Sequence, residues 1–299
     1  MAHLALRFCG EEALLRTGAA KAGRPAAGHD RAALPDLAWP ILGCLLASPH
    51  HRATRGGLMA QLWPDQDEDG ARHRFATALW RIRSALAEAA PMIVAEGEVI
   101  ALNLDAHAWV DAVAVERRLT AVLAAPQRLA LPGERRRLVH ALGQYRGPFL
   151  PERDQEWIML QRARLQSLHL DALYALTAAA AQAGAWSEAQ VSASRLCAAE
   201  PLREDAQRLL MEAHLRCGNR ALALRQYRRC EAILAQELGV APMPETRALA
   251  ATIAGEDHGA AIPVLLPAVP DDATSRAALI DARDKVLETL RIIDRALTC

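Results

Sequence analysis

The chain has 299 residues, enough for two domains, and its 52% hydrophobic and 23% charged residues are ordinary for a soluble globular protein. Its 35 basic residues balance 35 acidic ones, so the net charge attracts neither nucleic acid nor a membrane surface. Any affinity for nucleic acid must therefore come from a local basic patch.

The cysteines and the N-terminus exclude several other classes of protein. No CxxC pair and no histidine at metal-ligand spacing accompanies the cysteines, so we expect reduced, buried thiols and no metal. The first residues carry charges too close together for a signal peptide, and no apolar run approaches the roughly 20 residues of a membrane span. We expect a cytoplasmic protein without a membrane partner. The six cysteines are Cys9, Cys44, Cys197, Cys217, Cys230 and Cys299.

The chain begins with two short β-prone runs, residues 3–8 and 12–16, around Gly10 and Glu11. They predict a small antiparallel pair of strands. Residues 18–36 are rich in Gly, Ala and Pro without periodicity, which predicts a long loop.

Three helices and a hairpin are predicted next. The apolar run 37–47 forms the first helix, and Thr54 can cap a second that runs to Trp63 and stops at Pro64. The third helix covers 70–86, and the reversal before it is typical of a helix-turn-helix. Residues 92–104 form two β-prone runs around Gly97, which predicts a hairpin. Together these elements predict a winged helix.

The third helix, 70–86, is a local basic patch of the kind that nucleic-acid binding would require in a chain with no net charge. It carries four arginines and a histidine and no acidic residue, whereas the residues just before it, 65–69, are mostly acidic. A helix dipole favours this order, with acid at the N-terminus. At 3.6 residues per turn one narrow stripe of the helix is apolar and faces a core. The stripe consists of Ala71, Phe75, Leu79, Ile82 and Leu86.

The opposite face of this helix is interpreted as a DNA-recognition surface. Arg72 and Arg83 flank the apolar stripe, and their guanidinium groups are expected to reach phosphates. For Trp80, packing against the hairpin or the following domain outweighs contact with a base. The alternative for the whole helix is a solvated amphipathic surface whose arginines only confer solubility. The predicted DNA-binding residues are Arg72, His73, Arg74, Thr77, Trp80, Arg81, Arg83 and Ser84, with Thr54 and Arg55 from the second helix.

Two strings in this region, ASPHHRATRGGLMAQLWPD and ARHRFATALWRIRSAL, resemble the winged-helix domain of the Streptomyces antibiotic regulatory proteins. The resemblance covers residues 3–104 and implies a winged helix of the response-regulator type. It further implies that the helix ending in Arg81-Ile82-Arg83 lies in the major groove. The wing departs from the family pattern, because it shows Glu96 and Glu98 where basic or aromatic residues are usual.

Beyond residue 105 the pattern is helical, with helices predicted from Trp109 to Leu123, from Glu134 to Leu142 and from Arg153 to Ala183. The strings YRGPFLP and EW followed by RARL resemble the bacterial transcriptional activator domain that follows the winged helix in the same family. The string ELGVAPMPET at 237–246 resembles the usual ending of that domain.

A repeat appears in the second half of the chain. Gly184 and Gly218 lie 34 residues apart, as do Ala189 and Ala223, and 34 is the tetratricopeptide period. Such helix pairs bury their apolar faces by stacking on one another. Residues 153–254 are therefore predicted to form a short α-solenoid.

The last segment has a linker at 255–272 and a helix at 273–297, whose apolar residues alternate in steps of three and four. This helix either dimerises or folds back on the solenoid. Trp63, Trp109 and Trp157 are predicted to lie in the core by their periodicity.

The predicted fold is mainly α, an N-terminal winged helix-turn-helix with short hairpins followed by an all-α tetratricopeptide-like domain. The expected division is 1–104, 105–254 and 255–299. No catalytic motif and no cofactor site is found, so an enzyme is not expected. The favoured function is a transcriptional activator that binds double-stranded promoter half-sites as a homodimer, with RNA polymerase and a small-molecule effector as further candidate partners. The alternative is a helical-repeat interaction module whose winged helix no longer reads DNA.

Overall fold

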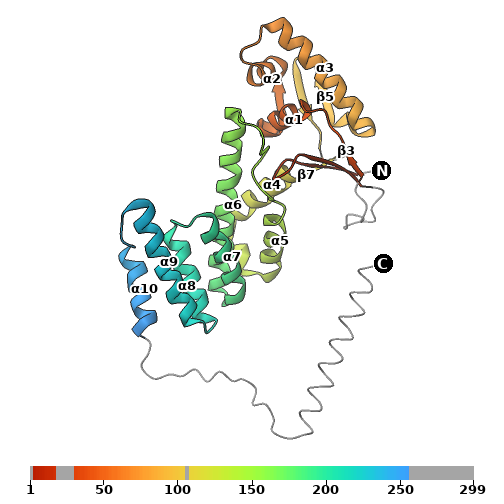
Figure 1. Ribbon diagram of the computed structural model, residues 1–299. Helices are drawn as coiled ribbons and strands as arrows, with labels where there is room; N and C mark the ends of the chain where they lie inside the picture. The colour runs from red at the N-terminus through yellow and green to blue at the C-terminus, as the bar shows by residue number, and fades with distance from the viewer. Residues whose placement is uncertain (1–2, 18–29, 105–107, 256–299) are drawn as a thin grey trace, which may run out of the picture. The chain divides into compact units, whose positions relative to one another are not determined.

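The structure is a computed structural model that describes residues 3–17, 30–104 and 108–255 (Figure 1). Most of these residues are helical, and the strands are short and lie in the N-terminal half, as predicted for the fold class. The linker expected up to residue 272 lies outside the described residues except for its first one. The helix expected at 273–297 lies wholly outside them.

A four-stranded sheet is built from strands that precede the winged helix in the sequence and from one strand that follows it. Strands β1 (His3–Arg7) and β2 (Ala13–Thr17) form the predicted antiparallel pair. Two further strands join them in the order β3-β2-β1-β7, namely β3 (Asp30–Ala32) and β7 (Ala108–Val110). Two expectations are wrong here. The predicted loop contains β3, and the start of the helix predicted from Trp109 is a strand parallel to β1.

The predicted winged helix is confirmed. Helices α1 (Ala38–Ala47), α2 (Arg55–Leu62) and α3 (Glu68–Leu86) precede a hairpin of β5 (Ile93–Glu96) and β6 (Val99–Leu102). Gly97 occupies the turn with a φ of 58°, a conformation that favours glycine. A further strand, β4 (Arg52–Thr54), pairs with β6, so the wing is a three-stranded sheet. Two 3-10 turns, Pro49–His51 and Ala87–Met92, connect these elements.

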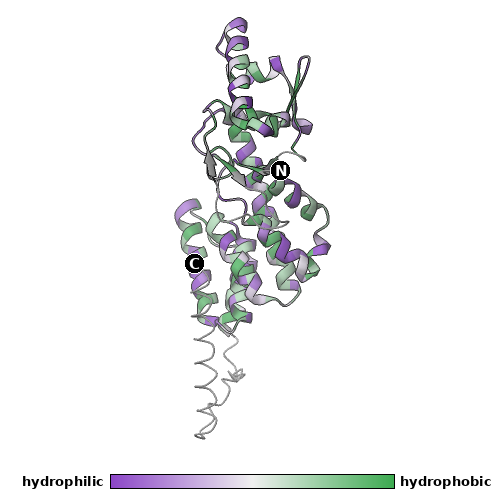
Figure 2. Cartoon of the chain, turned by 90° about the vertical axis from the view of Figure 1, so that its right-hand side faces the viewer, coloured by the Kyte–Doolittle hydropathy of each residue, from purple (hydrophilic) through white to green (hydrophobic). Residues whose placement is uncertain are grey.

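The second half is helical. Helix α4 (Asp111–Ala124), the 3-10 turn Pro126–Ala130 and α5 (Pro132–Leu142) lead into the long helix α6 (Glu156–Gln182). Then α7, α8, α9 and α10 follow, and neighbours from α6 to α9 pack on one another as the 34-residue repeat predicts. Figure 2 shows hydrophobic residues, in green, alternating with hydrophilic ones along these helices. The last four span Trp186–Ala199, Glu204–Arg216, Arg220–Leu238 and Pro244–Gly255.

One hydrophobic core joins the winged helix to the start of the helical half. Phe8 stacks on Phe149 with ring centroids 5.6 Å apart and meets Trp39 edge-on at 5.3 Å. Leu150 and Trp157 belong to the same core. The division at residue 104 stays a prediction, and this core passes across it.

Polar contacts reinforce that junction. The buried carboxylate of Asp111 accepts hydrogen bonds from the backbone N–H groups of Phe8 and Cys9 at 2.9 and 3.0 Å. Arg153, just before α6, pairs with Glu12 at 2.8 Å and with Asp36 at 2.6 Å. Charged groups therefore hold the end of β1 to the start of α4, and the turn before β2 to the segments that precede α1 and α6.

Several side-chain expectations can now be judged. Trp157 is buried, as predicted, and Trp63 is half-buried against the core. Trp109 is 39% exposed, so its predicted place in the core is wrong, because β7 turns alternate side chains to opposite faces. Of the cysteines, Cys9, Cys44, Cys197 and Cys230 are buried, Cys217 is half-buried, and Cys299 lies outside the described residues.

Among the described helices, none is both long and apolar enough to cross a bilayer. Within the same ranges no three side chains from His, Cys, Asp and Glu gather as a metal site would require.

Candidate nucleic-acid interface

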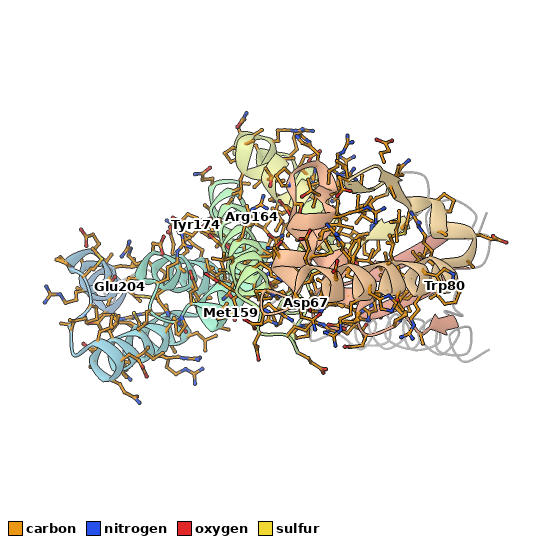
Figure 3. All side chains as sticks on the ribbon, turned by 90° about the horizontal axis from the view of Figure 1, so that it is seen from above. Asp67, Trp80, Met159, Arg164, Tyr174 and Glu204 are labelled. Atoms are coloured by element: carbon orange, nitrogen blue, oxygen red, sulfur yellow. The ribbon has the colours of Figure 1, made fainter. Side chains whose placement is uncertain are left out.

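Two capping side chains define the helix-turn-helix. Thr54 accepts a hydrogen bond from the backbone N–H of Gly57 at 3.1 Å and so begins α2, as predicted. Asp67 accepts from the N–H of Gly70 at 3.2 Å and begins α3 two residues earlier than expected. Figure 3 labels Asp67 before α3 and Trp80 in its second half. The acidic residues 65–69 thus lie at the positive end of the helix dipole.

One side of α3 is fixed in the core. Phe75 and Ile82 are 2% and 0% exposed, and the whole predicted stripe is buried together with Ala78. Burial of this stripe determines which side chains face solvent, because residues three and four apart share a face. The buried residues of α3 are Ala71, Phe75, Ala78, Leu79, Ile82 and Leu86.

The opposite side of α3 carries the predicted recognition residues at the surface. Arg74 and Arg81 lie one above the other on one flank, seven residues apart, and both are exposed. Neither makes a hydrogen bond or an ion pair with another described residue, so both guanidinium groups are available to a ligand. His73 and Ser84 are exposed beside them, and Thr77 is half-buried between.

Trp80 corrects one expectation. Packing against the hairpin or the helical half was expected, but 68% of the residue is exposed. The indole therefore lies on the solvent side of the helix, close in sequence to Arg81. A large exposed aromatic side chain amid cations is typical of a binding surface rather than of a core.

Arg72 and Arg83 also lie differently from the expectation that they reach outward. Arg72 forms ion pairs with Glu68 and Asp69 of its own first turn. Arg83 is half-buried, and its Nη2 donates to the backbone carbonyl of Ile93 in β5 at 3.2 Å. Arg72 therefore compensates acid at the helix start, and Arg83 joins α3 to the wing.

Hydrogen bonds join the N-terminus of α2 to the turn of the wing. Arg55 donates from Nε to the carbonyl of Gly97 at 3.1 Å, and its backbone N–H donates to the carbonyl of Glu98 at 2.8 Å. The predicted DNA contacts Thr54 and Arg55 thus have structural roles. Thr54 is exposed and still has a hydroxyl proton to donate to a phosphate.

Arg52 is a surface residue that sequence reasoning missed. It lies on β4 and pairs with Glu96 of the wing at 3.6 Å, and both side chains are exposed. The pair offsets part of the acidity that distinguishes this wing. The registers of β4 and β5 on β6, which place Arg52 opposite Ala101 and Glu96 opposite Val99, bring the two together.

This surface offers hydrogen-bond donors, and its charged donors are all guanidinium groups. The two unpaired guanidinium groups of α3 can each bind a guanine edge or a phosphate, and Ser84 and Thr77 add hydroxyl donors. The acidic first turn repels phosphate. The part of α3 from Arg74 onward is therefore best suited to contact a nucleic acid.

Comparison with known proteins agrees with this architecture. Residues 110–254 match the bacterial transcriptional activator domain. The chain is 30% identical over 261 residues to the regulatory protein AfsR of Streptomyces coelicolor, and 29% identical over 258 residues to AfsR of Streptomyces griseus. These matches cover 83% and 80% of the chain but 26% of each relative. The chain therefore spans about a quarter of the length of these relatives.

A solved structure shares the fold. Mycobacterium tuberculosis EmbR, determined in complex with a low-affinity phosphopeptide, superposes with a TM-score of 0.63 at 22% identity. The match covers 86% of this chain and 66% of EmbR.

The described architecture is therefore a winged helix followed by a bacterial transcriptional activator domain. Over this architecture the chain is similar to the AfsR regulatory proteins of Streptomyces.

Proposed function

We propose that the chain activates transcription by binding double-stranded promoter DNA through α3. The observation that carries the proposal is the pair Arg74 and Arg81, which are exposed and unpaired among the described residues on a helix whose other side is fixed in the core. A rigid helix holds its contacting groups in one geometry, which sequence discrimination requires. Such a protein acts where the chromosome lies, which in a bacterium is the cytoplasm.

The experiment measures binding of the full chain to genomic fragments selected for affinity, at two salt concentrations. Arg81→Ala is expected to weaken binding to the selected fragment by about 1 to 3 kcal/mol, roughly tenfold or more in affinity, because a bidentate contact to guanine is lost. Arg229→Ala, which removes an exposed arginine of α9, is the matched control and is expected to bind like the parent. Equal binding by Arg81→Ala would contradict the assigned orientation of α3.

The acidic wing favours a second candidate function. Glu96 and Glu98 are exposed at its tip, and acid there repels a DNA backbone. In this alternative the winged helix is a protein-binding module. It predicts no preference among fragments, whereas a sequence-specific binder shifts selected fragments and weakens steeply as salt rises.

Two protomers are expected on one operator. A single recognition helix reads too few bases to stand out in a genome, and regulators of this kind gain affinity from two half-sites about one helical turn apart. The helical half or residues 273–297 would supply the contact between subunits. Sedimentation of a defined operator complex tests this, with the full chain and with a variant lacking 273–299. One protomer bound tightly and specifically would refute the pairing.

The helical half is then free to contact a further partner. We propose RNA polymerase as that partner, because an activator must act on the polymerase or on its access to the promoter. Binding of purified polymerase to the operator DNA is measured with and without the chain, and tighter binding in its presence is expected.

A further inference from the structure

An open cleft of about 450 Å³ lies in the helical half, between α5, α6 and α7. Its floor is apolar and consists of Leu142, Leu173 and Leu176, which are buried. Val139 and Val191 form its walls and remain 49% and 60% exposed. Helices α5 and α7 lie near each other below the upper part of α6 in Figure 1. The cleft has the size and the apolar lining of a small-molecule site.

The rim of the cleft is positively charged. Arg136 of α5 and Arg195 of α7 are exposed, and neither makes a hydrogen bond or an ion pair within the described residues. Glu188 is the acidic residue of the lining, and its carboxylate is already paired with Nε of the buried Arg135 at 2.8 Å. The two rim arginines are therefore not compensated by the acid beside them.

Two serines line the cleft, of which Ser187 is exposed and Ser192 has its hydroxyl engaged. Ser192 is buried and donates its hydroxyl proton to the backbone carbonyl of Glu188 at 3.0 Å. Arg135 is held in place, because it also donates to the carbonyls of Leu129 and Ala130, each at 3.1 Å. The wall formed by α5 is thus fixed against α7 before any ligand arrives.

We propose that this cleft binds a small organic carboxylate with an apolar body, whose carboxylate group lies between Arg136 and Arg195. Burying Val139 and Val191 under a hydrocarbon body removes apolar surface from water. Guanidinium groups bind carboxylates through parallel hydrogen bonds, which selects an anionic head over a neutral one. The site is separate from the α3 surface, and ligand binding can be measured without DNA.

The test is calorimetric titration of the full chain with three probes: decanoate, 1-decanol and acetate. Decanoate is expected to bind saturably with one site per chain, 1-decanol at least tenfold more weakly, and acetate not measurably. The double variant Arg136→Gln/Arg195→Gln is expected to lose at least tenfold in affinity for decanoate and to bind 1-decanol as the parent does. Val191→Gln is expected to weaken both ten-carbon probes.

A matched control distinguishes a site from general attraction of anions. Arg228→Gln/Arg229→Gln removes two exposed arginines of α9, outside the cleft, and is expected to bind decanoate like the parent. Absence of saturable decanoate binding would overturn the proposal. So would 1-decanol binding as tightly as decanoate, or an equal loss in both double variants. Circular dichroism of each variant confirms that it is folded.

Discussion

Arg83 donates a hydrogen bond from its Nη2 to the backbone carbonyl of Ile93 at 3.2 Å, which links the last turn of α3 to the first residue of β5 in the wing. The arginine is half-buried, so the bond is partly shielded from water. Arg83→Ala is therefore expected to lower the free energy of unfolding by about 1 kcal/mol, as urea titration measures. Arg81→Ala, two residues away and exposed, should change it by less than about 0.5 kcal/mol. Equal stability of the two variants would show that the link to the wing contributes nothing.

Phe75 anchors α3 in the core and is 2% exposed. Phe75→Ala is expected to lower the unfolding free energy by about 3 to 5 kcal/mol, because it leaves a cavity beneath α3. Ser84→Ala on the solvent side of the same helix is the control and should leave the midpoint of urea unfolding nearly unchanged. A Phe75→Ala protein as stable as the parent would contradict the observed facing of the helix.

Trp80 has the opposite environment, since 68% of it faces solvent. Trp80→Ala should leave stability within about 0.5 kcal/mol of the parent. If α3 enters the major groove, the same change should weaken binding to a selected fragment, because the indole supplies apolar contact area beside Arg81. Fluorescence anisotropy of a labelled fragment measures the affinity. Unchanged affinity would place Trp80 outside the DNA interface.

Asp111 predicts a dependence of stability on pH. Burial raises its pKa to about 6, and the hydrogen bonds from Phe8, Cys9 and Ala112 offset only part of this rise. The folded state therefore holds the proton more tightly than the unfolded state, whose aspartates titrate near pH 4. The unfolding free energy should fall by up to about 3 kcal/mol as pH rises from about 4 through 6, at roughly 1.4 kcal/mol for each pKa unit.

The comparison variant for this effect is Asp111→Asn, which cannot titrate. Its stability should lack the fall between pH 4 and 6, although it should be less stable than protonated wild type, because its amide NH2 cannot accept from Cys9. Asp65→Asn, at an exposed position before α3, should keep the wild-type slope. A slope that persists in Asp111→Asn would assign the titration to another group. Urea unfolding at half-unit pH intervals provides the data.

Elements with a long, regular pattern were predictable from sequence. The stripe of α3 and the 34-residue repeat each depend on local periodicity, and the structure confirms both. The hairpin of the wing was predictable for the same reason, because Gly97 lies between two β-prone runs. These patterns also identify which side of α3 faces solvent.

What escaped prediction depends on partners that are distant in sequence. Strand β7 has three residues and forms only because β1, about a hundred residues earlier, offers it a parallel edge. The half-buried position of Arg83 requires β5 at its side, and the pair of Arg52 and Glu96 requires the registers of both β4 and β5 on β6. None of these relationships leaves a local signal. For this reason the helix that carries the candidate site was predicted better than the partners of its individual arginines.

Because β1 and β7 belong to one sheet, residues 38–102 are an insertion between strands of the same sheet rather than a separate domain joined by a linker. A cut at residue 104 would remove β7 and the Asp111 carboxylate, and would leave Leu6 and Phe8 without Phe149 and Trp157. The winged helix therefore cannot be transplanted intact by moving the first hundred residues alone. A chimera that exchanges the segment between β3 and β7 keeps both ends of the sheet, and is the natural unit for engineering or for recombination among relatives.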